Sequence, residues 1–214
     1  MCGRFVNTNK IEDINTFFNI EYNLANDMSL PISYNISPSQ YSPIIIEENK
    51  LKKIEMMYWG LIPSWSKDKK FSTNMINARI ESIKEKPSYK NLIHTSRCIV
   101  IASGYYEWTK IKSKKQPHYI TNDKNLLPIA GLWTKWNDIS SFTIITKNAD
   151  SNLSSIHHRM PLVIDDRAIN TYLNRDIPFD QSYNISKSEL IYHKVSTMVN
   201  SSVYNDRSCI RSID

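Results

Sequence analysis

The residues best suited to covalent chemistry stand at the start of the chain, which reads MCGRF. Removal of Met1, which is usual before a small second residue, leaves Cys2 with a free α-amine beside its thiol. An α-amine titrates at about 7.7–8 and a thiol at about 8.5, so both have a reactive fraction near neutral pH. Such a 1,2-aminothiol condenses with an aldehyde to an imine, which the thiol closes to a thiazolidine. The alternative is that Cys2 is a small buried start residue, and MCG alone does not decide.

A second candidate is Glu107, between Tyr106 and Trp108 in SGYYEWTK. Aromatic neighbours would desolvate the carboxyl and raise its pKa toward the range useful for proton transfer. We place it directly after a strand and a glycine turn. The competing interpretation is a solvent-facing position on an alternating strand.

A third candidate segment is IHHRMP, which offers His157, His158 and Arg159 between a polar loop and an apolar stretch. An imidazole can exchange a proton near neutral pH, and a guanidinium can bind a phosphate bidentately. Adjacent side chains of an extended segment diverge, so metal binding by the pair is not expected. Taken alone, the two histidines could also be an ordinary surface pair.

Other segments supply groups that would suit a nucleic acid. The NAR segment offers Asn77, which could orient a nucleophile, and Arg79, which could contact a phosphate. Pro38 lies in YNISPSQ, and Trp59 and Trp65 lie in YWGLIPSW. Aromatic rings interleaved with arginines suit single-stranded nucleic acid, whose bases stack and whose phosphates pair with cations. Core packing is the alternative role for each tryptophan.

Composition limits the class of protein. The 214 residues are 41% hydrophobic, with no apolar run near the roughly 18 residues of a membrane helix and no signal-peptide pattern. Three widely spaced cysteines support neither a disulfide framework nor a cysteine zinc site. We therefore expect a cytoplasmic protein. A net charge of +6 is compatible with a polyanionic partner, although the lysine clusters at 67–70 and 110–115 could simply be solvated surface.

The pattern of apolar residues predicts an α+β fold, a single domain of mainly antiparallel sheet with a few helices. KIEDINTFFNI (10–20) and DDRAINTYLNR (165–175) have helical spacing, the second with Asp165 or Asp166 as cap. In the strand predicted over 51–60, Ile54, Met56 and Tyr58 alternate. The predicted strands span 43–49, 51–60, 97–102, 117–121, 127–133, 141–147, 161–164 and 189–196. The four glycines, Gly3, Gly60, Gly104 and Gly131, are expected at special backbone positions.

In order along the chain, the segments form a recognisable set. MCGRF, YNISPSQ, WGLIPSW, INARIES, RCIVIASGYYEW, AGLW, IHHRMP and VSTMVN together resemble the SRAP (SOS response-associated peptidase) family of abasic-site processing proteins. The matches run from residue 2 to about residue 200, so the resemblance implies one SRAP domain over residues 1–214 with a barrel-like sheet.

The resemblance implies a protein that crosslinks itself to abasic sites in single-stranded DNA through a thiazolidine and so protects the site from strand cleavage. Met1 would leave by self-cleavage or through an aminopeptidase, and a lyase-like side activity is possible. We expect a monomer without cofactor, metal or membrane attachment, associated with the nucleoid if the host is bacterial. The implied catalytic residues are Cys2, Asn77, Glu107 and His157, and the implied DNA contacts are Arg4, Arg79, Arg159, Pro38 and Trp65.

Two other function classes deserve comparison. Class II glutamine amidotransferase domains also begin MCG, but they need glycine-rich oxyanion and glutamine-binding segments, and only four unpaired glycines exist here. A non-catalytic single-strand binding module would explain Trp65 and the arginines but would leave Cys2, Glu107 and His157 without a role.

Overall fold

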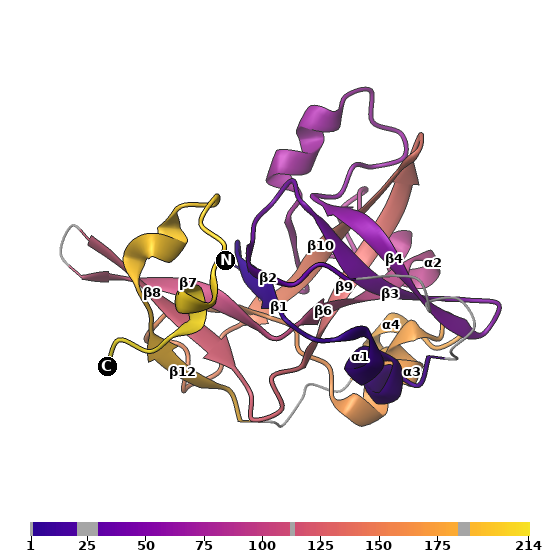
Figure 1. Ribbon diagram of the computed structural model, residues 1–214. Helices are drawn as coiled ribbons and strands as arrows, with labels where there is room; N and C mark the ends of the chain where they lie inside the picture. The colour runs from indigo at the N-terminus through magenta and orange to yellow at the C-terminus, as the bar shows by residue number, and fades with distance from the viewer. Residues whose placement is uncertain (1, 21–29, 112–113, 184–188) are drawn as a thin grey trace.

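The computed structural model describes residues 2–20, 30–111, 114–183 and 189–214 (Figure 1). Its strands are β1 (Phe5–Asn7), β2 (Ser33–Ile36), β3 (Tyr41–Glu48), β4 (Leu51–Trp59), β5 (Asn77–Arg79), β6 (Arg97–Ala102), β7 (Gly104–Ile111), β8 (Lys114–Thr121), β9 (Leu127–Trp136), β10 (Ile139–Asn148), β11 (Arg159–Pro161) and β12 (Ile191–Lys194). The α-helices are α1 (Ile11–Phe18), α2 (Leu92–Thr95), α3 (Ile169–Leu173) and α4 (Phe179–Ser182). The 3-10 helices are η2 (Lys69–Asn74), η3 (Asp166–Ala168), η4 (Thr197–Asn200) and η5 (Arg207–Ile210).

The strands form two sheets. One has the order β12-β8-β7-β1-β2, and the other has the order β11-β10-β4-β3-β6-β9. Because β9 pairs with β10 as well as β6, the strands β10, β4, β3, β6 and β9 close into a ring. Pairing is antiparallel except where β10 meets β4 and β5. The predicted α+β fold with mainly antiparallel sheet is therefore confirmed.

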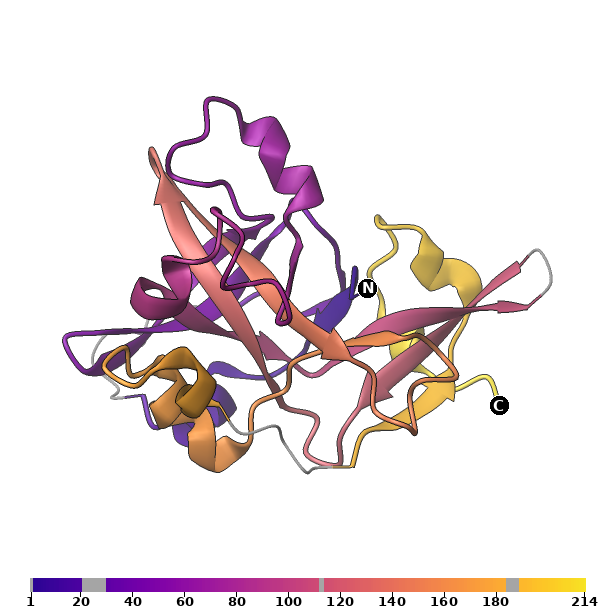
Figure 2. The ribbon, with the colours of Figure 1, turned by 180° about the vertical axis from the view of Figure 1, so that it is seen from behind.

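Three apolar clusters hold these layers together. Phe5, Trp59 and Tyr105 belong to the cluster that contains residues of both sheets. A second cluster joins the ring to α1, α3 and α4, which Figure 1 shows grouped beside it. A third packs the five-stranded sheet against the C-terminal segment, drawn in yellow in Figures 1 and 2. The five-stranded sheet thus has an apolar cluster on each of its faces, which explains why its short strands are ordered.

Most predicted elements are confirmed. The helix predicted over 10–20 is α1, with Ile14 and Phe18 buried, and Asp165 rather than Asp166 caps η3 by accepting a hydrogen bond from the Arg167 backbone at 3.0 Å. The prediction of a strand over 161–164 was wrong in extent. Only Pro161 belongs to β11, while Val163 makes a single bridge to Ile129.

The predicted alternation in β4 was incomplete. Ile54 is buried in the cluster on the helix side, but Met57 and Trp59, which the alternation did not include, are fully buried in the cluster between the sheets. A strand with apolar clusters on both sides needs apolar residues on both faces, which the alternation rule does not anticipate. In the described part of the chain, no helix has the length and apolar character to cross a membrane.

Gly104 begins β7, the strand that carries Glu107, and its position requires glycine for lack of space. A Cβ there would lie 2.5 Å from the Tyr119 ring and 2.6 Å from the Ile120 carbonyl oxygen. We predict that Gly104→Ala lowers the free energy of unfolding by about 2 kcal/mol, since overpacking forces neighbouring groups to shift. Urea denaturation measures this. Lys135→Ala, at an exposed position of β9, should change stability by less than about 0.5 kcal/mol. Equal losses in the two variants would contradict the steric argument.

Candidate functional site

Cys2 lies three residues before the start of β1 and is completely buried, within the apolar cluster between the two sheets. Its thiol lies 3.9 Å from the Arg4 carbonyl oxygen, and burial raises the thiol pKa far above its ordinary value. The expectation of a buried start residue and that of a reactive one are therefore compatible. A thiol held neutral in this way needs a base beside it before its sulfur can attack.

Asn77 connects Cys2 to the other sheet. This residue begins β5, and its Nδ2 donates a hydrogen bond to the Cys2 carbonyl oxygen at 2.9 Å. Its Oδ1 is buried and accepts no hydrogen bond within the described residues. The amide therefore fixes the Cys2 backbone with one end and offers a free acceptor at the other, because a primary amide carries both groups.

Glu107 lies inside β7 rather than after a turn, and it is only 3% exposed. Burial raises the pKa of its carboxyl to about 7. A carboxyl that titrates near neutral pH can both accept and return a proton, which an ordinary surface glutamate does poorly. The predicted desolvation thus agrees with the structure, and the solvent-facing alternative does not.

His157 approaches Glu107 from the loop before β11, with 4.0 Å between its Nδ1 and the Glu107 Oε1. The backbone N–H of Arg159 lies 2.9 Å from the same Nδ1, and the Arg159 carbonyl oxygen lies 3.1 Å from it. Burial lowers the pKa of His157, so the neutral ring is favoured. Neighbouring His158 is exposed and stacks on His157 at 4.4 Å between ring centroids.

The three predicted phosphate-binding arginines differ in environment. Arg79 is exposed at the end of β5. Arg4 is half-buried, and its guanidinium donates to Asn35 Oδ1 at 2.6 Å and to the Val199 carbonyl at 2.9 Å. These contacts tie β1 to the C-terminal segment and fix the direction in which Arg4 points.

Arg159 is buried, with a bidentate contact to Glu81 at 2.6 and 2.9 Å. It also donates to Asn148 Oδ1 and to the Thr146 carbonyl, both at 2.7 Å. A phosphate would have to displace Glu81 to reach its Nη atoms. This pair leaves no local sequence signal, because Glu81 and Arg159 are 78 residues apart and only the β5–β10–β11 pairing brings them together.

The two other predicted DNA contacts lie at the surface. Pro38 is half-buried in the turn after β2. Trp65 is 60% exposed, and its ring packs edge-to-face with Phe71, with 6.2 Å between the ring centroids. An exposed indole is available for stacking, so core packing is not the role of Trp65. Trp59, by contrast, is completely buried and stacked on Phe142.

A cavity of about 440 Å³ opens at Glu107 and His157. Its lining comprises Arg4, Glu107, Trp108, Lys110, Lys115, His157 and Asn200. Sequence reasoning had assigned no role to Trp108 or Asn200, although both stand in segments that carry the family resemblance. Their side chains are hydrogen-bonded, with Trp108 Nε1 donating to Asn200 Oδ1 at 2.7 Å.

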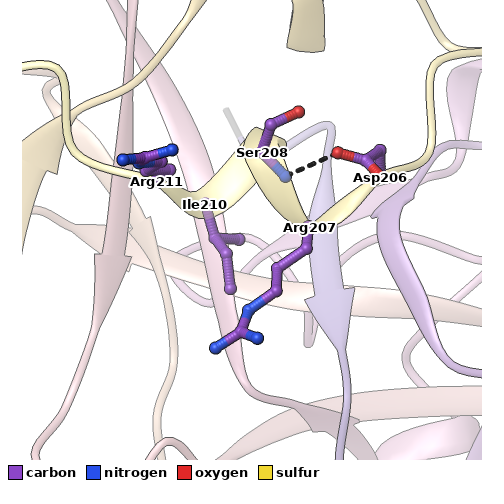
Figure 3. Close-up of a pocket in the computed structure, with 5 residues that line it drawn as sticks. All are labelled: Asp206, Arg207, Ser208, Ile210 and Arg211. Atoms are coloured by element: carbon purple, nitrogen blue, oxygen red, sulfur yellow. Dashed lines mark hydrogen bonds between the residues drawn. The ribbon is translucent and has the colours of Figure 1, made fainter.

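Two further features lie outside that lining. A cavity of about 600 Å³ is lined by Asp206, Arg207, Ser208, Ile210 and Arg211 of the C-terminal segment (Figure 3). It contains none of the predicted catalytic side chains. Tyr105, fully buried two residues before Glu107, has a hydroxyl without a hydrogen-bond partner among the described residues. The sequence YYEW does not show that the Tyr105 hydroxyl lacks a hydrogen-bond partner while the Tyr106 hydroxyl has one.

Comparison of the sequence with known proteins identifies the family. Residues 1–202 match the sequence model of the family described as SOS response associated peptidase (SRAP). The chain belongs to the SRAP family. The abasic site processing protein YoqW of Bacillus subtilis is 37% identical, with 99% of this chain and 100% of that protein covered. HMCES of Xenopus tropicalis, also named an abasic site processing protein, is 32% identical over 85% of this chain and 66% of its own length.

The fold is shared with solved structures as well. A protein from Bacteroides thetaiotaomicron superimposes with a TM-score of 0.85 at 23% identity, covering 99% of both chains. A protein from Bordetella bronchiseptica gives a TM-score of 0.74 at 22% identity, covering 91% of this chain and 100% of its own. At such identities the agreement shows that the SRAP fold is preserved.

Burial of Glu107 leads to a prediction about stability and pH. Its pKa is raised from 4.5 to about 7 on folding, so the folded chain binds the proton more tightly and stability falls as pH rises between those values. Glu107→Gln removes this cost. We expect the variant to exceed the wild type in unfolding free energy by about 3 kcal/mol at pH 8 and by less than about 1 kcal/mol at pH 5.

Denaturant titrations at the two pH values measure the difference, with the state of Met1 matched by intact mass. Glu85→Gln, at an exposed position, controls for the loss of a carboxylate. A stability difference between Glu107→Gln and wild type that is the same at pH 5 and pH 8 would show that the carboxyl is not held near neutrality by the fold.

Proposed function

We propose that this protein recognises abasic sites in single-stranded DNA and links itself to them covalently through Cys2. The observation that carries the proposal is that Asn77 binds the Cys2 backbone, that the Glu107 carboxyl acts electrostatically on the Cys2 thiol, and that His157 lies beside Glu107. The names of YoqW and HMCES as abasic site processing proteins support the same direction. The ring-opened abasic site carries the aldehyde that an aminothiol captures.

The reaction begins once Met1 has left and the Cys2 nitrogen is a free amine. The neutral amine adds to C1′ of the open sugar, and the carbinolamine loses water to give an imine. The Cys2 sulfur then adds to the same carbon while the proton of the thiol passes to the nitrogen. The sum is aldehyde plus aminothiol giving thiazolidine plus water, with no change of oxidation state.

Each neighbouring residue has a role in that sequence. Glu107, with a pKa of about 7, shuttles the protons that leave the amine and thiol and that are needed to expel water. His157, in the fraction that carries a second proton, donates that proton to the sugar ring oxygen, which promotes ring opening. Asn77 holds the Cys2 backbone through the 2.9 Å hydrogen bond. Proton transfer alone contributes about 10²–10⁴-fold in typical enzymes, so these roles are worth testing separately.

The remaining predicted residues bind DNA around the lesion. Arg4 lines the same cavity as Glu107, and the exposed Arg79 is free to contact a flanking phosphate. Trp65 and Pro38 stack or wedge beside the unpaired site. Glu107 and His157 also assist removal of Met1 by the protein itself. The crosslink protects the strand from cleavage and is slowly reversed through Glu107.

The test is incubation with an abasic single-stranded oligonucleotide followed by a denaturing gel. The wild type is expected to give a heat-stable protein–DNA band, and an oligonucleotide whose aldehyde has been reduced with borohydride is expected to give none. Reversible binding without a covalent band would favour the non-catalytic module. Glutaminase activity would favour the amidotransferase alternative.

A Cys2→Ala variant separates the two bond-forming steps. With Met1 removed, as checked by intact mass, it keeps the amine and forms the imine but cannot close the thiazolidine. We therefore expect loss of the heat-stable band and strand cleavage by β-elimination. The matched control Cys209→Ala leaves the N-terminus unchanged and should retain the band. A heat-stable crosslink of wild-type yield from Cys2→Ala would exclude the aminothiol mechanism.

Arg79→Gln and Arg159→Gln test the phosphate contacts. Each lost contact should reduce the slope of log affinity against log salt by about 0.7 for single-stranded DNA. Arg159→Gln should also lower the unfolding free energy by about 2 kcal/mol, since Glu81 and Asn148 Oδ1 lose the guanidinium that donates to them, whereas Arg79→Gln should not. A salt slope that Arg159→Gln leaves unchanged would make Arg159 a structural residue and not a DNA contact.

A further inference from the structure

The hairpin of β7 and β8 carries a pair of lysines that the catalytic roles leave unexplained. Lys110 and Lys115 are register partners on the two antiparallel strands, and both are exposed. Directly opposed like charges destabilise a strand pair. The sequence analysis left their cluster, residues 110–115, open between solvated surface and a polyanion contact.

These two lysines also lack the acidic neighbours that several other lysines have. Lys84, Lys124 and Lys194 each pair with an aspartate. Within the described parts of the chain, no ion pair is found for Lys110 or Lys115. Their repulsion is therefore not offset by a described carboxylate.

Both lysines line the cavity of about 440 Å³ that contains Glu107 and His157. Arg4 lies in the same lining, so three cationic side chains face one acidic residue, whose pKa is already raised to about 7 by burial. The cavity therefore attracts anions more strongly than its composition alone suggests. Along an extended strand, Lys110 is about 10 Å from Glu107, which is too far to contact the reacting carbon.

On the basis of the proposed function, we propose that Lys110 and Lys115 form a phosphate-binding rim for the DNA strand that flanks the abasic site. The single-stranded DNA leaves the reaction site along β7 and β8, which Figure 1 shows extending outward beside the C-terminal segment. Binding of a phosphate between the two ammonium groups removes their mutual repulsion. The contact is sequence-independent, since it uses only charge.

The experiment measures non-covalent affinity, so that the rim is separated from the covalent chemistry. The probe is a fluorescent single-stranded oligonucleotide with a tetrahydrofuran abasic analogue, which has no aldehyde. Anisotropy titrations over salt compare wild type, Lys110→Gln/Lys115→Gln, and the charge-retaining Lys110→Arg/Lys115→Arg. A matched control, Lys86→Gln/Lys90→Gln, removes the same charge at exposed positions outside the cavity.

The glutamine pair at 110 and 115 is expected to reduce the salt slope by about 1.4, which corresponds to two contacts at about 0.7 each. The arginine pair should keep the wild-type slope, and the control pair should keep it nearly so. Oligonucleotides shortened on the 5′ or the 3′ side of the analogue show which side of the DNA contacts Lys110 and Lys115. Shortening on the hairpin side should weaken the wild type but should weaken Lys110→Gln/Lys115→Gln no further.

Two outcomes would overturn the rim. One is a slope for Lys110→Gln/Lys115→Gln equal to that of the control pair. The other is the same sensitivity to shortening in that variant and in wild type on both sides. Failure of the proposed function looks different, because the wild type itself would then give no covalent band with an abasic oligonucleotide.

Discussion

The site depends on one contact between the two sheets, the hydrogen bond from Asn77 to the Cys2 carbonyl oxygen. Cys2 precedes β1 of the five-stranded sheet, and Asn77 begins β5 beside the ring of the other sheet. A residue next to a chain terminus is ordinarily frayed. Here the burial of the Cys2 side chain and the hydrogen bond to its carbonyl oxygen determine where Cys2 lies. Glu107 and His157 can act on Cys2 only because its position is fixed in this way.

The same burial that fixes Cys2 determines the acid–base properties of the site. Removing solvent raises the pKa of both the thiol and the Glu107 carboxyl and lowers the pKa of His157, so all three favour their neutral forms. Glu107 can therefore take up and release a proton near neutral pH, because its pKa is about 7. It also contains polar atoms without partners in the described structure, such as Asn77 Oδ1 and Tyr105 Oη. Such atoms cost stability as long as they remain without a partner.

The cationic side chains differ in whether they are available to bind an anion. Arg159 is neutralised by Glu81 and held in the sheet, and Arg4 is oriented by carbonyl and amide oxygens. Arg79 and the hairpin lysines remain exposed. The net charge therefore does not show which cations can bind an anion. Burial and pairing decide which arginines stabilise the fold and which remain available to a ligand.

The sequence alone determined the family and the α+β class, and it singled out Arg4, Glu107 and His157 of the cavity lining, because those depend on local order and residue type. It also located α1 and long strands such as β3, β4, β9 and β10, whose apolar periodicity is strong, but it did not predict β7, which is eight residues long. It missed β1, β2 and β5, which are three or four residues long and too short to show a period. Only the tertiary structure decided that Glu107 lies within a strand, that Arg159 is paired with Glu81, and that Lys110 and Lys115 share a cavity with Glu107. Each of these depends on strand register and burial, which are set by contacts between residues far apart in the chain.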